Sequence, residues 1–226
     1  MSTIDEAVSD TSRRISRHTL ATRLNHWLMA ASMIVLLGTA FLPILGIKFS
    51  WVTAHWVAGL VFTASVIFHV GYVLIRQDLR SMRITMREYS DLLRSLSGSL
   101  EKLKVRPGKY WVLQKVYHHL ISLLSFVAIV TGVLMLFKVD FPIWERDPYI
   151  LSDDTWGIVY VLHDYSALLF IPMIMIHIYF AIRPEKLFYT RSMILGWITR
   201  EEFRTHHDSE VWEISESEVN RDHANG

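Results

Sequence analysis

Two histidines lie fourteen residues apart within one long apolar segment of the chain. His163 and His177 both fall in the stretch from Thr155 to Ile182, which is long enough to cross a bilayer. Over fourteen residues a helix returns to within about 40° of its starting direction and rises roughly 21 Å, so both imidazoles project from one face. The spacing favours two stacked haems, each held by an imidazole from this helix and another from a neighbour. Two unrelated polar residues packed against other helices are the simpler alternative.

The composition restricts how any cofactor is held. The chain has 226 residues, of which 51% are hydrophobic and 20% charged, and it contains no cysteine. The absence of cysteine excludes disulfides, thiolate-bound iron–sulfur clusters and c-type haem attachment, so histidine is left as the cofactor ligand. Its apolar residues are gathered in four blocks, as in an integral membrane protein. We therefore expect membrane lipid as a partner, and no nucleic acid.

These blocks predict four spanning helices, at about residues 21–42, 50–76, 111–137 and 155–182. The predicted organisation is an N-terminal segment (1–19), a transmembrane domain (20–184) and a C-terminal tail (185–226) with a short helical pattern around Ser192 to Phe203. Arg and Lys concentrate before the first helix, between the second and third, and after the fourth, which predicts cytoplasmic termini. The basic connection from Arg76 to Lys109 is partly amphipathic and predicts a surface helix along the headgroups.

This topology gives each histidine a depth in the membrane. His55 and His163 lie near the outer ends of the second and fourth helices and can share an outer haem. His26 and His177 lie near the inner ends of the first and fourth helices and can share an inner haem. Small residues that would let a flat macrocycle approach a helix are Gly38, Gly59 and Gly132, and helix–helix contact explains each of them equally well.

His69 leaves the inner ligand pair open. It is fourteen residues from His55 on the same predicted helix, at inner depth, and it is an alternative partner for His177. Two histidine pairs on the second and fourth helices would resemble the b561-type pattern. A third haem between His69 and either His118 or His119 is a further alternative.

Several motifs occur in order along the chain: R-x-x-H-W at Arg23–Trp27, H-x-x-x-G at His55–Gly59, GKY-x-x-x-QK at Gly108–Lys115, TGV at Thr131–Val133, H-x13-H at His163–His177, and Thr199-Arg200 followed by His206-His207 and Trp212. In these motifs the chain resembles the cytochrome b, or gamma, subunit of membrane-bound respiratory formate dehydrogenases. That superfamily includes the cytochrome b subunits of hydrogenases and thiosulfate reductases.

The resemblance implies an all-α, integral membrane four-helix bundle with two b-type haems and both termini cytoplasmic. Its implied ligands are His55 and His163 for the outer haem and His26 and His177 for the inner haem. It also implies a quinone site, for menaquinone or ubiquinone, around the GKY-x-x-x-QK segment. The candidate residues there are Gly108, Lys109, Tyr110, Gln114, His118 and His119. Trp111 and Leu113 stand where the family often has asparagine and glycine.

The implied function is electron transfer from an extracytoplasmic iron–sulfur subunit, itself served by a molybdenum/tungsten or nickel–iron catalytic subunit, to a quinone. The expected location is a bacterial or archaeal cytoplasmic membrane, with the chain crossing it several times. On this interpretation the chain is an electron-transfer and quinone-reducing subunit of a larger oxidoreductase, rather than a complete enzyme. A stand-alone b561-type reductase, or the same fold carrying electrons from quinol to a periplasmic reductase, is the alternative. The sequence leaves open the donor, the direction of flow, the quinone and the oligomeric state.

Overall fold

The computed structural model describes residues 14–76, 82–86, 88–90, 93, 109–207 and 212. The chain divides into two compact units, and each is described by itself. The bundle unit comprises Leu24–Tyr72 and His119–Ile178, and the terminal unit comprises Met1–Arg23, Val73–His118 and Tyr179–Gly226.

Four long helices dominate the part of the chain that the structure describes, as the hydropathy pattern predicts. Their bounds are α2 Leu20–Phe41, α3 Trp51–Arg76, α5 Val112–Leu136 and α6 Asp153–Ile182. All four are long and apolar enough to cross a membrane. The helices differ from the predicted spans by one or two residues at most of their ends. The predicted all-α fold with four spanning helices is confirmed, and the chain is a multi-pass membrane protein.

The bundle unit buries small polar side chains and exposes large apolar ones, as expected of a protein that lies in lipid. Buried hydroxyls donate to the carbonyl four residues earlier on their own helix, as Ser32 does to Leu28 and Ser125 to Ile121. Because each such hydroxyl is satisfied inside its helix, neighbouring backbones can approach closely at no hydrogen-bonding cost. Outward-facing side chains such as Ile34 are largely exposed.

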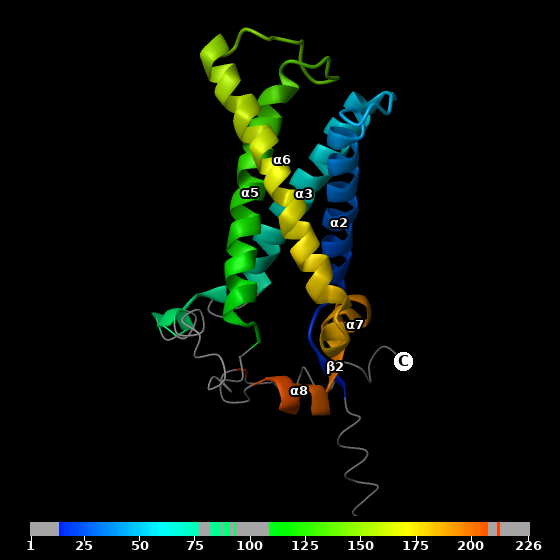
Figure 1. The fold of residues 1–226 in the computed structure, drawn as a ribbon, viewed down its shortest axis with the longest axis vertical. Helices are drawn as coiled ribbons and strands as arrows, with labels where there is room; N and C mark the ends of the chain where they lie inside the picture. The colour runs from blue at the N-terminus through cyan, green and yellow to red at the C-terminus, as the bar shows by residue number, and fades with distance from the viewer. Residues whose placement is uncertain are drawn as a thin grey trace, which may run out of the picture. The chain divides into compact units, whose positions relative to one another are not determined.

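Two hairpin loops lie at the same end of the bundle, one joining α2 to α3 and the other joining α5 to α6 (Figure 1). In the second loop, Phe141 and Trp144 form an isolated antiparallel bridge, and the Trp144 ring stacks on Phe137. The Trp56 ring of α3 packs edge-on against Phe141 at 5.1 Å between ring centroids. These contacts hold the α5–α6 loop against the start of α3, close to His55 in the sequence.

The terminal unit contains a two-stranded antiparallel sheet that the sequence did not predict. β1 (Arg14–Ser16) pairs with β2 (Trp197–Thr199), with Ile15 opposite Ile198. Both isoleucines are almost fully buried, in a cluster with Phe188, Phe203 and Trp212. The sheet joins a segment before the first spanning helix to a segment after the last one. The hydrophobic cluster buries the central side chain of each strand, Ile15 and Ile198.

Three short helices flank this sheet: η3 (Pro184–Lys186), α7 (Leu187–Leu195) and α8 (Arg200–His206). The predicted helical pattern from Ser192 to Phe203 is therefore divided. Gly196 has a φ of +96° and ends α7 in the left-handed conformation that only glycine adopts without strain. After β2, a capping box between Thr199 and Glu202 starts α8. Most of the predicted surface helix between Arg76 and Lys109 lies outside the described residues.

Candidate functional site

His55 on α3 and His163 on α6 face each other inside the bundle unit. Their ring centroids are 6.2 Å apart, with an angle of 69° between the ring planes. α3 begins directly after the α2–α3 loop, so this pair belongs to the end of the bundle that carries the loops (Figure 1). We call His55 and His163 the loop-end pair.

A second pair repeats this spacing farther along the helices. His26 of α2 and His177 of α6 also have ring centroids 6.2 Å apart, with an interplanar angle of 49°. We call them the opposite pair. Because both pairs draw one histidine from α6, the fourteen-residue interval on that helix sets their separation along the bundle.

The spacing within each pair has a chemical meaning. Imidazole nitrogens bind transition-metal ions at about 2.0–2.1 Å, so two imidazoles that would share one iron have ring centres at most about 6.3 Å apart. The ring spacing of 6.2 Å in both pairs therefore fits two imidazoles that would share one iron.

A cavity of about 390 Å³ adjoins the loop-end pair. Its lining is mostly apolar and comes from all four spanning helices, including Met33, Leu36, His55, Gly59, Phe62, Ile129, Gly132, His163 and Phe170. Of the glycines that the sequence suggests for macrocycle contact, Gly59 and Gly132 line this cavity. Such a lining suits a large, flat, apolar ligand with a small number of polar groups.

Lys138 supplies positive charge at this cavity. Its Nζ donates to the Tyr160 hydroxyl at 2.6 Å and lies 4.3 Å from the centroid of the buried Trp156 ring. Lys138 and Tyr160 both line the cavity, together with Asp164. The side chain is thus held where it could pair with a carboxylate on a bound ligand.

The comparison with known families agrees with this geometry. The profile of the prokaryotic cytochrome b561 family matches residues 17–196, which include all four spanning helices and both histidine pairs. The chain belongs to the prokaryotic cytochrome b561 family. No curated protein matches it.

Membership of the prokaryotic cytochrome b561 family establishes that the chain binds b-type haem and transfers electrons in a membrane. The residues present fit that group, because paired imidazoles at ligand spacing stand beside an apolar cavity with a nearby cation. Haem ligation would also explain why histidines lie within apolar spanning helices. The sequence-based prediction of a membrane cytochrome b is therefore confirmed at the level of the family.

His69, the alternative ligand, lies half-buried on α3 of this cytochrome b. His26 and His177 have the same ring spacing as the loop-end pair. The equal spacing supports His26 rather than His69 as the partner of His177.

The quinone-site candidates fall mainly in the terminal unit. Gly108 lies outside the described residues, whereas Lys109, Tyr110, Gln114 and His118 belong to the terminal unit and His119 begins the next segment of the bundle unit. The Gln114 side-chain oxygen accepts a 2.9 Å bond from the Trp111 backbone N–H. Gln114 thereby caps the start of α5, where backbone N–H groups lack helical partners.

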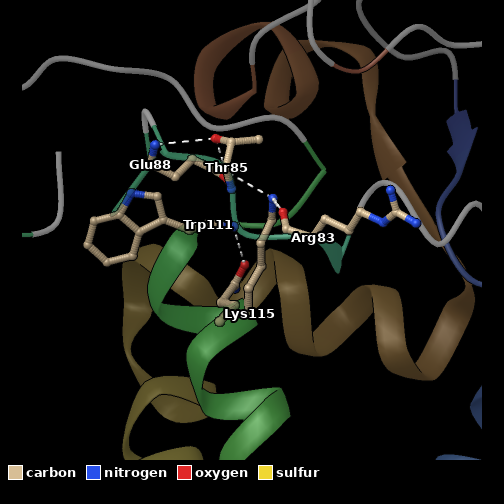
Figure 2. Close-up of polar contacts among 6 residues, drawn as sticks. Arg83, Thr85, Glu88, Trp111 and Lys115 are labelled. Atoms are coloured by element: carbon tan, nitrogen blue, oxygen red, sulfur yellow. Dashed lines mark hydrogen bonds and ion pairs between the residues drawn. The ribbon is translucent and has the colours of Figure 1, made fainter. Parts of the chain in front are cut away.

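Lys115 follows in the same motif and is also engaged (Figure 2). Its buried Nζ donates to Glu88 at 2.8 Å and to the Arg83 carbonyl at 2.9 Å. Glu88 in turn accepts from the backbone and hydroxyl of Thr85. Burial raises the pKa of Glu88, whereas the hydrogen bonds from Lys115 and Thr85 lower it. Together these effects lower the pKa of Glu88 below its ordinary value. The GKY-x-x-x-QK segment therefore anchors the α3–α5 connection to the start of α5.

Arg17 forms a second buried polar cluster in the terminal unit. Its guanidinium donates to the Lys109 carbonyl at 3.0 Å and to His207 Nε2 at 2.9 Å, and it lies over the rings of Tyr189 and Trp212. Burial lowers the pKa of Arg17 from its usual value, although a guanidinium stays protonated. The tail motif of His207 and Trp212 is thus explained by contacts with Arg17 of the predicted N-terminal segment.

Proposed function

We propose that this cytochrome b is the membrane-anchoring dihaem subunit of a formate dehydrogenase-like respiratory complex. The observation that carries the proposal is the repetition of one ring spacing, 6.2 Å, in two histidine pairs that share α6. One haem at each pair would give two electron carriers in series along a single helix. The motif resemblance supports the choice of a formate dehydrogenase-like complex.

In this proposal His55 and His163 bind one haem and His26 and His177 bind the other. The bound haems supply reversible one-electron chemistry. The protein holds the imidazoles, excludes water through the apolar lining, and balances ligand carboxylates with Lys138. By the distribution of Arg and Lys, the loop-end pair would face the extracytoplasmic side.

The loop end would then dock the iron–sulfur subunit that delivers electrons from a molybdenum/tungsten or nickel–iron catalytic subunit. Its loop between α5 and α6 carries Glu145 and Asp147, and the first turn of α6 carries Asp153 and Asp154, all of them exposed acidic groups. Charge on such a surface favours rapid encounter with a basic partner. A menaquinone or ubiquinone would accept the electrons, with Tyr110, His118 and His119 as candidates for binding it or moving protons.

The test is a count of haems with their midpoint potentials, by redox-titrated absorbance of the protein purified in mild detergent. Two b haems per chain are expected. Replacing His55 or His163 with alanine should remove one, and replacing His26 or His177 should remove the other. His69→Ala is the matched control, since it removes a half-buried imidazole from the same bundle and should leave two haems.

The contrary result is that His69→Ala loses the haem proposed at the opposite pair while His26→Ala keeps it. That result would make His69 and His177 the ligands and would favour a stand-alone b561-type reductase. The soluble subunits that co-purify identify the donor side. Rapid mixing of the reduced protein with a short-chain menaquinone, and of the oxidised protein with the quinol, shows which direction is faster. A protein with no b-type absorbance would contradict the proposal altogether.

A further inference from the structure

Each histidine of the loop-end pair is hydrogen-bonded to a threonine of the preceding spanning helix. Thr39 Oγ1 on α2 lies 2.8 Å from His55 Nδ1 on α3, and Thr131 Oγ1 on α5 lies 2.9 Å from His163 Nδ1 on α6. Both threonines are buried. The same contact therefore occurs twice, between different pairs of helices.

The direction of these hydrogen bonds follows from the other contacts of the hydroxyls. Thr39 Oγ1 is 2.7 Å from the Val35 carbonyl, and Thr131 Oγ1 is 2.7 Å from the Val127 carbonyl. A carbonyl oxygen only accepts, and a hydroxyl has one hydrogen to donate. Each hydroxyl therefore donates to its own helix and accepts from the ring, which places the imidazole hydrogen on Nδ1.

This assignment leaves Nε2 of His55 and His163 without a hydrogen and able to bind iron. A ligating imidazole that donates its other N–H is fixed in tautomer and orientation and becomes a stronger electron donor to the metal. His26 of the opposite pair differs: among the described residues, its Nδ1 is buried without a hydrogen-bond partner. The two proposed haem sites thus differ in the groups that support their ligands.

We propose that Thr39 and Thr131 are positioning residues for the loop-end haem, which fix the tautomer of both its ligands and lower its reduction potential. Stronger donation from the imidazoles stabilises the oxidised iron, because the ferric ion carries more positive charge. The inference rests on the proposed function, since it requires a haem at the loop-end pair. A lower potential at this end favours electron flow from the loop end toward the opposite pair.

The experiment compares Thr39→Val and Thr131→Val with Thr39→Ser and Thr131→Ser in the full chain purified in mild detergent. Valine keeps the shape of threonine and removes the hydroxyl, whereas serine keeps the hydroxyl. The valine variants should raise the midpoint potential of the loop-end haem, change its low-spin ferric EPR signal, and weaken haem retention about tenfold. The serine variants should retain the wild-type potential, and the opposite haem should be unchanged throughout.

Ser32→Ala on α2 and Ser125→Ala on α5 are matched controls, because each removes a buried hydroxyl that donates to the carbonyl four residues earlier. They should leave both potentials unchanged. If the valine variants lose the haem entirely, the serine variants decide the question. They should keep both haems, and loss of the loop-end haem from the serine variants as well would overturn the inference.

Two b haems in the wild type with unchanged potentials and EPR signals in the valine variants would overturn the inference while sparing the proposed function. Equal shifts in the valine and serine variants would also overturn it, because packing would then be the cause. A wild-type protein without b haem would overturn both.

Discussion

Gly132 provides the space that the ring of His163 occupies. A Cβ atom built on Gly132 would lie 3.2 Å from His163 Cε1, closer than side-chain carbons ordinarily approach. Gly132 and Thr131 are neighbours on α5, so one residue makes room for the ring and the other accepts its hydrogen bond. Two adjacent positions on α5 thus place a single imidazole on α6.

Replacing Gly132 with alanine should displace the His163 ring by a few tenths of an ångström and disturb the loop-end haem. We expect overpacking to cost about 1–3 kcal/mol and to shift or remove one b-type signal in a redox titration, with the other signal unchanged. Gly71→Ala on α3 is the control, because its added methyl group would meet nothing within 4 Å. A Gly132→Ala protein with two unaltered signals would contradict this prediction.

Lys138→Met should weaken binding of a haem at the loop end. The substitution removes the cation that lines the cavity and donates to Tyr160. A hydrogen bond between charged groups contributes about 1.5–3 kcal/mol, so roughly tenfold or greater loss of haem affinity is expected. Haem content after dilution in detergent measures it. Tyr160→Phe is the companion variant: it keeps the cation, and its haem content should remain closer to that of the wild type.

Gly196→Ala should destabilise the terminal unit more than Gly46→Ala destabilises the α2–α3 loop. Both glycines have positive φ, which costs about 1–2 kcal/mol for other residues. At Gly196 a Cβ atom would also lie 3.0 Å from the His18 carbonyl oxygen, whereas Gly46 has open space. Limited proteolysis of the C-terminal segment should detect the difference. Equal sensitivity of the two variants would show that the steric contact contributes nothing.

The Glu88–Lys115 ion pair should make stability depend on pH on the acidic side. The pKa of Glu88 is lowered in the folded protein, so its contribution is present above the ordinary carboxyl pKa of about 4.3 and is lost as the pH falls through the lower folded value. Thermal unfolding in detergent should show Glu88→Gln to be less stable than wild type near pH 7, with the gap closing in acid. Glu201→Gln, at an exposed position on α8, should show no such gap.

The spanning helices and the histidine spacing could be predicted from the sequence because both follow from local periodicity. A block of apolar residues predicts a span, and a fourteen-residue interval predicts a shared helix face whatever the neighbouring helices do. The prediction extended to which helices carry the histidines. The choice between His26 and His69 was left to the family resemblance, because both lie at similar depth.

The threonine contacts could not be predicted in the same way. Thr63 makes the same bond to the carbonyl four residues earlier as Thr39 and Thr131 do, so the local sequence does not mark a threonine that also accepts from a histidine. The contacts of Arg17 could not be predicted either, because Lys109 and His207 lie 92 and 190 positions away in the sequence. Such long-range pairings depend on the tertiary fold.

The pairing of β1 with β2 has a consequence for synthesis of the protein. Arg14–Ser16 leaves the ribosome before the four spanning helices, but its partner Trp197–Thr199 is translated only after them. The nascent chain must therefore keep Ile15 without its strand partner throughout membrane insertion. The sheet can therefore form only after the last spanning helix has been translated. A chain truncated before Thr199 lacks part of β2, so β1 cannot pair along its full length.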